Sequence, residues 1–325
     1  MKLRRIRSGD KTTVQALGPN GWVAVSDAAL QSSIKSGLCG PMTWTENIIE
    51  FLALPPAIRA DIESAVASVD PSKLTPCVIL PFEPRSCRDF MFYERHLHDA
   101  ARGFVRKFWP RYMPLVHLYE IISSKPFPAF RPKKLWHREP IYYMGNHLAF
   151  ITDDDQIVQP PYTAALDYEL ELGFVLARGL YNACPDEAEA AIGGFVVFND
   201  ISARDLQFLE MQSGFGPQKS KHFCNAISST LVTADEILPI WQSLQGFVKI
   251  NDQLVSQPTS GGARWSLGDA LSHASRSERL LPGEFFGTGT FPGGSGIEIG
   301  RLLEVGDVVE IGIEGIGYIR NHVVR

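Results

Sequence analysis

The sequence predicts an α+β protein that is mostly β, with a small N-terminal α+β domain over residues 1–75 and a larger domain over residues 76–325. Three observations favour this class. Residues 166–172 alternate apolar and acidic side chains, which is the period of a strand. Short apolar runs recur between turn residues after residue 141, and few segments of this second part show helical spacing.

Composition restricts the class of partner. A chain of 325 residues with 45% hydrophobic and 21% charged residues is ordinary for globular proteins. A net charge of -5 argues against a nucleic-acid or anionic-membrane partner, so we expect a small-molecule ligand. Five widely spaced cysteines suit reduced thiols better than a disulfide framework or a zinc site. With no signal-peptide core and no spanning apolar run, we expect a soluble, cytoplasmic protein.

The N-terminal segment reads as strands followed by helices. Leu3–Arg7 is strand-like, a turn and a second strand-like run follow, and a helical pattern opens at Asp27. Further helices are predicted over residues 45–51 and 55–69, where apolar residues recur every three or four positions and proline lies in the first turn. No catalytic group stands out here, so we expect a role in packing or in stabilising a dimer.

The next segment predicts a helix that carries candidate functional groups. Residues 76–84 read as a strand and linker, and residues 88–101 have helical spacing with two histidines and three acids. These charges are either the solvated face of an amphipathic helix or part of a site. The stretch to about residue 134 is rich in proline, lysine and aromatics. Because proline at that density breaks regular elements, we expect a lid or a partner-facing excursion.

The remainder predicts short strands and long loops. A helical patch over residues 185–191 leads to an apolar run at 192–198 that predicts a buried strand. Further strands are predicted at 230–233, 246–250 and 308–313. The glycine-rich loop at 287–296 has no following Gly-Lys-Ser or Gly-Lys-Thr element, which argues against a phosphate cradle.

The acidic strand indicates a metal site. Alternation places Asp167, Glu169 and Glu171 on one face, and like charges so close together repel unless a cation lies beside them. A bound divalent cation is the simplest such partner. Asp200 follows the buried strand and can reach the same edge, although an Asn-Asp turn or a helix cap also accounts for it.

Four groups of motifs resemble the fumarylacetoacetate hydrolase family. They are residues 167–172, 198–207 and 220–223, and the Gly-Thr-Gly-Thr and Gly-Ser-Gly-Ile-Glu-Ile segments that end at Ile299. The resemblance covers roughly residues 76–325. It implies a mixed β-roll main domain, a homodimer and one Mg²⁺, Ca²⁺ or Mn²⁺ held by oxygen ligands. The ligands that the resemblance implies are Asp89, Glu169, Glu171 and Asp200, with Asp167 as a neighbour.

The same resemblance implies catalytic roles. His96 lies seven residues after Asp89, as in family members that cleave 1,3-diketones, and Glu298 matches the glutamate that orients this histidine. A histidine paired with a carboxylate can deprotonate water, while the metal polarises the carbonyl under attack. The resemblance assigns polar contacts with the developing charges to Arg204, Gln207 and Lys221. We place Met91, Tyr143 and Thr290 in the substrate pocket.

Two departures from the family pattern concern the distal end of the substrate. Met91 stands where a related hydrolase has a carboxylate-contacting tyrosine, and Val105 stands where an arginine is expected, with Arg102 and Arg106 nearby. Apolar side chains cannot pair a charge, so we expect an apolar or neutral distal end. Lys221 fits the lysine role better than Lys219.

Three functions are compatible with these motifs. The first is a metal-dependent hydrolase that cleaves a carbon-carbon bond in a 1,3-diketo acid, such as fumarylacetoacetate or an acylpyruvate. The second is a family relative that catalyses decarboxylation, tautomerisation or dehydration through a metal-bound enolate. The third is a non-catalytic dimeric binding protein, which the retention of every acidic ligand disfavours. The presence of both His96 and Glu298 favours hydrolysis.

Overall fold

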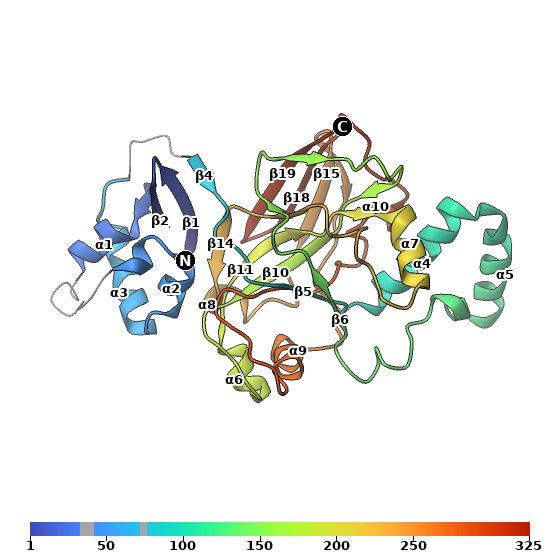
Figure 1. The fold of residues 1–325 in the computed structure, drawn as a ribbon, viewed down its shortest axis with the longest axis horizontal. Helices are drawn as coiled ribbons and strands as arrows, with labels where there is room; N and C mark the ends of the chain where they lie inside the picture. The colour runs from blue at the N-terminus through green and yellow to red at the C-terminus, as the bar shows by residue number, and fades with distance from the viewer. Residues whose placement is uncertain (33–41, 72–76) are drawn as a thin grey trace.

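The computed structural model describes residues 1–32, 42–71 and 77–325 and has an α+β fold (Figure 1). The expected boundary between residues 75 and 76 touches residues 72–76, which lie outside the described part of the chain.

The helices are short except for α4. The α-helices are α1 (Val25–Gln31), α2 (Ile48–Ala53), α3 (Pro56–Val66), α4 (Glu94–Phe108), α5 (Met113–Ser123), α6 (Pro185–Glu189), α7 (Arg204–Gln212), α8 (Ala234–Ile237), α9 (Leu267–Ala274) and α10 (Gly296–Ile299). The 3₁₀ turns are η2 (Thr43–Thr45), η3 (Pro110–Tyr112) and η4 (Pro128–Phe130).

The strands fall into two larger sheets and one small pair. They are β1 (Lys2–Ser8), β2 (Lys11–Gly18), β3 (Gly21–Ala24), β4 (Cys77–Ile79), β5 (Cys87–Phe90), β6 (Tyr142–Gly145), β7 (Phe150–Ile151), β8 (Gln156–Val158), β9 (Leu166–Asp167), β10 (Leu170–Leu176), β11 (Ile192–Asn199), β12 (Ser202–Ala203), β13 (Asn225–Ile227), β14 (Thr230–Thr233), β15 (Gly246–Ile250), β16 (Gln253–Ser256), β17 (Phe285–Gly287), β18 (Val308–Ile313) and β19 (Gly317–Val324). The main sheet runs β3-β2-β1-β14-β11-β10-β17-β5-β6, the second runs β16-β15-β18-β19-β8, and β9 pairs with β12.

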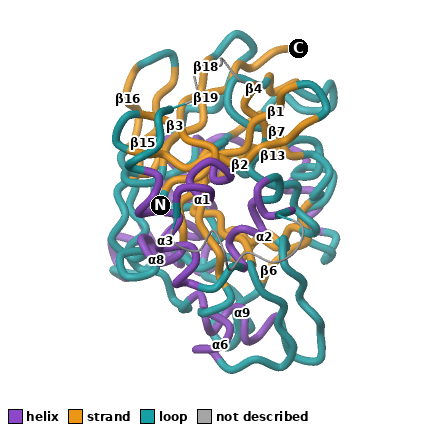
Figure 2. Tube along the Cα trace, turned by 90° about the vertical axis from the view of Figure 1, so that its left-hand side faces the viewer, coloured by secondary structure: helices purple, strands orange, loops and turns teal. Residues whose placement is uncertain are grey.

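The N-terminal segment extends the main sheet. The predicted strand at Leu3–Arg7 is confirmed as part of β1, which pairs with β14 so that Leu3 lies opposite Leu231. Helices α1, α2 and α3 confirm the three predicted helical patterns, and Figure 2 shows them gathered beside β1, β2 and β3. Val14 and Phe51 belong to one buried cluster with Val196 and Phe285, so this segment shares a core with the rest of the chain.

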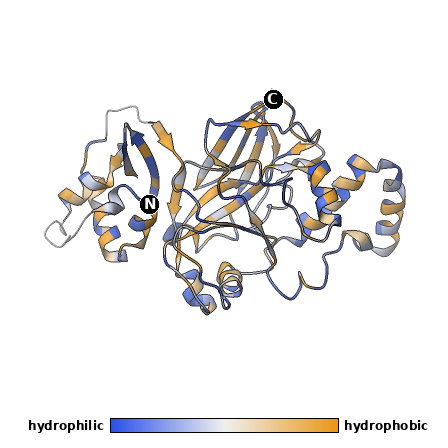
Figure 3. Ribbon diagram, viewed as in Figure 1, coloured by the Kyte–Doolittle hydropathy of each residue, from blue (hydrophilic) through white to orange (hydrophobic). Residues whose placement is uncertain are grey.

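Two predictions in the segment 88–134 are wrong in part. Residues 88–90 lie in strand β5 rather than in a helix, because β5 is hydrogen-bonded to β17 and β6, and α4 begins only at Glu94. The proline-rich excursion contains the regular helix α5, in which Pro114 lies in the first turn, where its missing N–H is tolerated. Figure 3 shows apolar residues along this helix, and Leu118 and Ile121 are exposed.

The acidic strand also differs from its prediction. It is divided into β9 and β10, and Glu169 between them forms an isolated bridge with Ser295. Neither face of β10 is exposed to solvent. All of its residues are buried, because β11 and β17 flank this strand in the middle of the sheet. The acidic face therefore lines the interior. Among the described residues, no helix has the length and apolar character needed to cross a membrane.

Candidate active site

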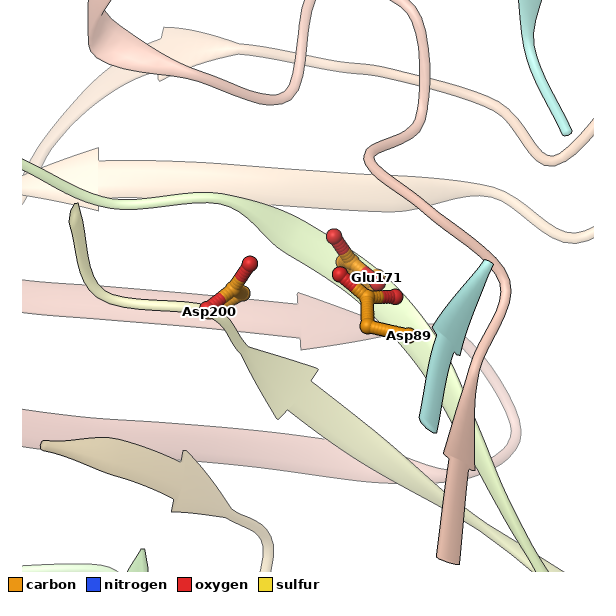
Figure 4. A group of neighbouring side chains, drawn as sticks. All are labelled: Asp89, Glu171 and Asp200. Carbon is orange, nitrogen blue, oxygen red and sulfur yellow. The ribbon is translucent and has the colours of Figure 1, made fainter. Parts of the chain in front are cut away.

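Three of the predicted ligands converge at the centre of the main sheet. Asp89 lies on β5, Glu171 on β10 and Asp200 just after β11, and their side chains point toward one another (Figure 4). One oxygen atom from each lies within 4.8 Å of those of the other two, and all three residues are buried. Strand order explains this convergence, because β17 pairs with both β5 and β10.

Two glycines make room for these carboxylates. A Cβ on Gly287 would lie 2.3 Å from Oδ1 of Asp89 and 2.8 Å from Oε2 of Glu171, so a side chain here would separate the two acids. Gly289 has a positive φ of 85°, and its N–H donates to Oε2 of Glu171 at 3.0 Å. The glycine-rich loop thus positions carboxylates rather than phosphates.

The electrostatics of this triad fit a hard cation. Burial, followed by the charge of Asp200, raises the pKa of Asp89 well above its ordinary value. Burial and the charges of Asp89 and Asp200 likewise raise the pKa of Glu171. Oδ1 of Asp89 is buried and has no hydrogen-bond partner among the described residues. A divalent cation would relieve both the repulsion and the unsatisfied oxygen, and an all-oxygen donor set suits Mg²⁺ or Ca²⁺.

Glu169, the fourth predicted ligand, lies outside the triad and is paired with cations. Its Oε1 accepts a hydrogen bond from Nη2 of Arg204 at 2.7 Å, and its Oε2 contacts Nζ of Lys221, which also contacts Asp200. Burial alone raises the pKa of Glu169, but Arg204 and Lys221 more than offset this and hold the pKa well below its ordinary value. Its role as a ligand stays a prediction.

Arg204 links several acidic and polar groups at the start of α7. Its Nε donates to Oδ2 of Asp167 at 2.7 Å, and its Nη1 donates to Oε1 of Gln207 at 2.9 Å. Asp167 also accepts from the backbone N–H of Ile297 at 3.0 Å, which places this acid outside the triad. The guanidinium is therefore held firmly at the wall of the site.

His96 lies between two carboxylates. Its Nδ1 is 3.1 Å from Oε2 of Glu298, close enough for a hydrogen bond although not aligned for one, and its Nε2 is 3.6 Å from Oε1 of Glu169. Burial lowers the pKa of His96, but the charges of Glu298 and Glu169 outweigh burial and raise it. Glu298 also accepts from the N–H and the hydroxyl of Ser295 as a cap of α10.

A cavity of about 1000 Å³ joins these groups. Ten of the twelve predicted site residues line it, and Asp200 and Glu298 do not. The ten are Asp89, Met91, His96, Tyr143, Glu169, Glu171, Arg204, Gln207, Lys221 and Thr290. The structure thus brings the predicted residues together around one space.

Two predicted pocket residues also support the carboxylates. The hydroxyl of Tyr143 donates to Oδ2 of Asp200 at 2.7 Å, and that of Thr290 donates to Oε1 of Glu171 at 3.3 Å. Sequence reasoning missed Asn225, whose amide nitrogen can donate to Oδ1 of Asp200 at 3.1 Å. It also missed Trp136, whose Nε1 donates to the backbone carbonyl of Met91 at 2.6 Å. Neither residue belongs to a motif that could have indicated it.

The fold matches that of a solved structure along the whole chain. It superposes on a fumarylacetoacetate hydrolase from the psychrophile Exiguobacterium antarcticum with a TM-score of 0.70 and 19% sequence identity. The superposition covers 100% of this chain and 99% of that protein. The family profile "Fumarylacetoacetate (FAA) hydrolase C-terminal" matches residues 123–324. The chain therefore belongs to the fumarylacetoacetate hydrolase family, which confirms the resemblance in its motifs.

Relatives within this family catalyse different reactions. A 2,4-didehydro-3-deoxy-L-rhamnonate hydrolase of Sphingomonas sp. (strain SKA58) is 31% identical over 210 residues, which are 63% of this chain and 69% of that protein. A mitochondrial oxaloacetate tautomerase of Rattus norvegicus, Fahd2a, is 28% identical over 188 residues, covering 58% and 59% of the two chains. Family membership therefore leaves hydrolysis and tautomerisation both open.

Proposed function

We propose that the protein is a metal-dependent hydrolase that cleaves a carbon-carbon bond in a 1,3-diketo acid of the acylpyruvate type. The observation that carries this proposal is the position of His96. It lies 3.1 Å from Glu298 and lines the same cavity as Asp89 and Glu171. Tautomerisation needs no activated water, whereas hydrolysis requires a base of this kind.

The side chains have distinct roles in this proposal. A divalent cation held by Asp89, Glu171 and Asp200, with Glu169 beside them, would supply Lewis-acid polarisation of the substrate carbonyl. His96 takes a proton from water at Nε2, and Glu298 stabilises the resulting imidazolium through Nδ1.

The cationic wall acts on the charge that develops during the reaction. Arg204 and Lys221 are buried, line the cavity and remain charged, since their carboxylate partners outweigh burial and raise the pKa of each. They, with the amide of Gln207, stabilise the oxyanion of the attacked carbonyl and the departing carbanion. Their existing hydrogen bonds hold them in place before substrate enters, so little reorganisation is needed.

The alternative is a reaction without water as nucleophile, namely tautomerisation, decarboxylation or dehydration. The similarity to the rat oxaloacetate tautomerase favours keeping this candidate. The same carboxylates and cations could serve it, with His96 moving a proton between carbon and oxygen. The two candidates differ in products, because only hydrolysis divides the substrate into two acids.

The deciding experiment follows the enol absorbance of 1,3-diketo acids, with acetylpyruvate as the first substrate, and measures pyruvate formed. We expect loss of the chromophore with stoichiometric pyruvate, abolished by EDTA and restored by Mg²⁺, Ca²⁺ or Mn²⁺. Rapid ketonisation of enol-oxaloacetate by the metal-loaded protein, with no pyruvate from any diketo acid, would instead establish the alternative.

We also propose that the protein acts as a homodimer with Mg²⁺ as its usual metal. Light scattering of the purified protein measures the oligomeric state directly, and a mass near 36 kDa would exclude the homodimer. Comparing activity restored by each cation at equal free concentration tests the second.

A further inference from the structure

Helices α4 and α7 both change from polar to apolar along the cavity. On α4, His96 lies in the first turn and the later cavity-lining residues are apolar. On α7, Arg204 and Gln207 come first and the later ones are again apolar. Spacings of three and four place each set on one helix face. The apolar set, together with Trp109 directly after α4, is here called the tail wall: Leu97, Ala100, Ala101, Phe104, Val105, Trp109, Phe208 and Met211.

Aromatic rings join the two helices within the tail wall. The rings of Phe104 and Phe208 have centroids 6.3 Å apart, and those of Trp109 and Phe208 are 4.6 Å apart with an edge contact. Such packing gives the wall a defined shape and strongly favours apolar ligand surface. At the rim, Phe215 is 84% exposed between Gly214 and Gly216, so a bound apolar group would cover it.

The tail wall offers no cation to a charged ligand end. Arg102 donates to Asp99 at 2.6 Å and to Glu120 at 3.0 Å. Arg106 donates to the backbone carbonyls of Ile297 and Glu298 at 3.1 and 2.8 Å. Neither arginine lines the cavity.

The polar groups that line the remaining side are few. Gln218 is uncharged, and the ring Nε2 of His222 lies 2.9 Å from the backbone carbonyl of Met144. A carboxylate buried against the tail wall would therefore lose its hydration without gaining a cation, which is strongly unfavourable.

The cavity is longer than the diketo acid head group needs. His96 and Val105 lie nine residues apart on α4, a rise of about 13 Å. A head group held between the triad and His96 leaves the tail wall uncovered. We propose that this wall binds the acyl tail and that the natural substrate carries a long alkyl or aryl-alkyl tail without a terminal charge. The identity of the head group rests on the proposed function, but the tail site does not.

Calorimetry with 2-oxo acids tests the tail site without turnover, because these acids lack the second carbonyl. For the metal-loaded protein, we expect Kd to fall about three- to fourfold for each buried methylene from pyruvate to 2-oxohexanoate. We expect 2-oxo-4-phenylbutanoate to bind tighter than pyruvate as well. The length-matched diacid 2-oxoadipate should bind at least about tenfold more weakly than 2-oxohexanoate. Equal or tighter binding of 2-oxoadipate would overturn the proposal.

Two variants and one control locate the effect. Ala101→Phe fills the space along the tail wall and should remove the dependence of Kd on tail length. Val105→Arg supplies a cation and should reverse the preference toward 2-oxoadipate. Leu209→Arg is the control, since Leu209 lies on α7 beside Phe208 but is 60% exposed and outside the cavity. Unchanged tail dependence in both variants, with native thermal unfolding, would refute the assignment.

Turnover separates this inference from the proposed function. Fumarylacetoacetate and a neutral-tailed acylpyruvate of similar length are compared, and we expect a kcat/KM at least about tenfold higher for the neutral substrate. If 2-oxo acids show tail dependence but no diketo acid is cleaved, the tail site stands and hydrolysis is wrong. If diketo acids are cleaved with no effect of tail in binding or turnover, hydrolysis stands and the tail site is wrong.

Discussion

At the scale of single residues, Glu171 is buried and held in place by hydrogen bonds. It accepts hydrogen bonds from the N–H of Gly289 and the hydroxyl of Thr290, and it is 1% exposed. These contacts orient its oxygens toward Asp89 and Asp200. Because all three acids crowd one buried space, the triad is explained better by cation binding than by stability of the fold.

Glu171→Ala should abolish binding of the divalent cation while leaving the fold largely intact. Removal of one oxygen ligand from three leaves too few groups to replace the water of a hard cation. Calorimetric titration with Mg²⁺ and Mn²⁺ measures this, with Glu314→Ala, at an exposed turn between β18 and β19, as the control. Full metal occupancy in Glu171→Ala would rule out the assigned site.

His96→Ala should lower kcat by about a hundred- to ten-thousand-fold with little change in KM. The expected loss follows from the proposed role of His96 as the general base, which acts on water and contributes little to substrate binding. Steady-state kinetics on the cleaved diketo acid provide the measurement. His98→Ala is the matched control, because His98 lies on the same helix but does not line the cavity. An unaltered kcat would exclude His96 as the base.

At the scale of elements, α4 reaches the site because it packs against α10 through a glycine. A Cβ on Gly103 would lie 2.0 Å from the backbone carbonyl oxygen of Ile297. This close approach brings the first turn of α4, with His96, to Glu298 on α10. The approach of His96 to Glu298 therefore depends on the absence of a side chain at Gly103, two turns further along α4.

Gly103→Ala should destabilise the protein by about 1–3 kcal/mol and lower kcat. Alanine is the better helix former by about 0.5–1 kcal/mol, but backbone atoms of α10 cannot move away cheaply, so the clash outweighs this gain. Urea unfolding measures the stability. Lys107→Ala, at an exposed position of the same helix, should stay within about 0.5 kcal/mol. A Gly103→Ala protein as stable as the parent would show that the contact relaxes.

At the scale of the whole molecule, long-range contacts hold sheet and loops together. Asp153, in the turn between β7 and β8, accepts hydrogen bonds from the N–H and hydroxyl of Ser229, which lies between β13 and β14. Its Oδ1 is buried with no hydrogen-bond partner in the described part of the chain. Burial raises the pKa of Asp153 to about 6 despite these bonds.

Asp153→Asn should therefore change how stability depends on pH. A carboxyl whose pKa is raised by folding favours the folded state when protonated, so its favourable contribution is complete below about pH 4 and is lost as pH rises through about 6. The variant should be more stable than the parent by on the order of 1 kcal/mol at pH 7, with less advantage at pH 4. Urea unfolding at both pH values tests this. A difference that is constant with pH would contradict the shifted pKa.

The local sequence pattern was sufficient to predict those strands whose tertiary contacts favour the same secondary structure. The predicted strands at 230–233, 246–250 and 308–313 are β14, β15 and β18, because apolar period and turn residues act over a few positions. The segment at 88–90 has helical spacing and yet forms β5. Hydrogen bonds to β17, nearly 200 residues away, outweigh that weak preference.

The sequence by itself determined the family, the acidic motifs and the set of residues that meet in the cavity, because each motif has a fixed chemical identity wherever it folds. Only the tertiary structure decided their pairing. Glu169 lies against Arg204 and Lys221 rather than in the triad, and the tail wall forms where α4 and α7 meet. Such pairings depend on distances between segments that are far apart in the chain. Burial then shifts the pKa of each ionisable group, and no local sequence pattern encodes either effect.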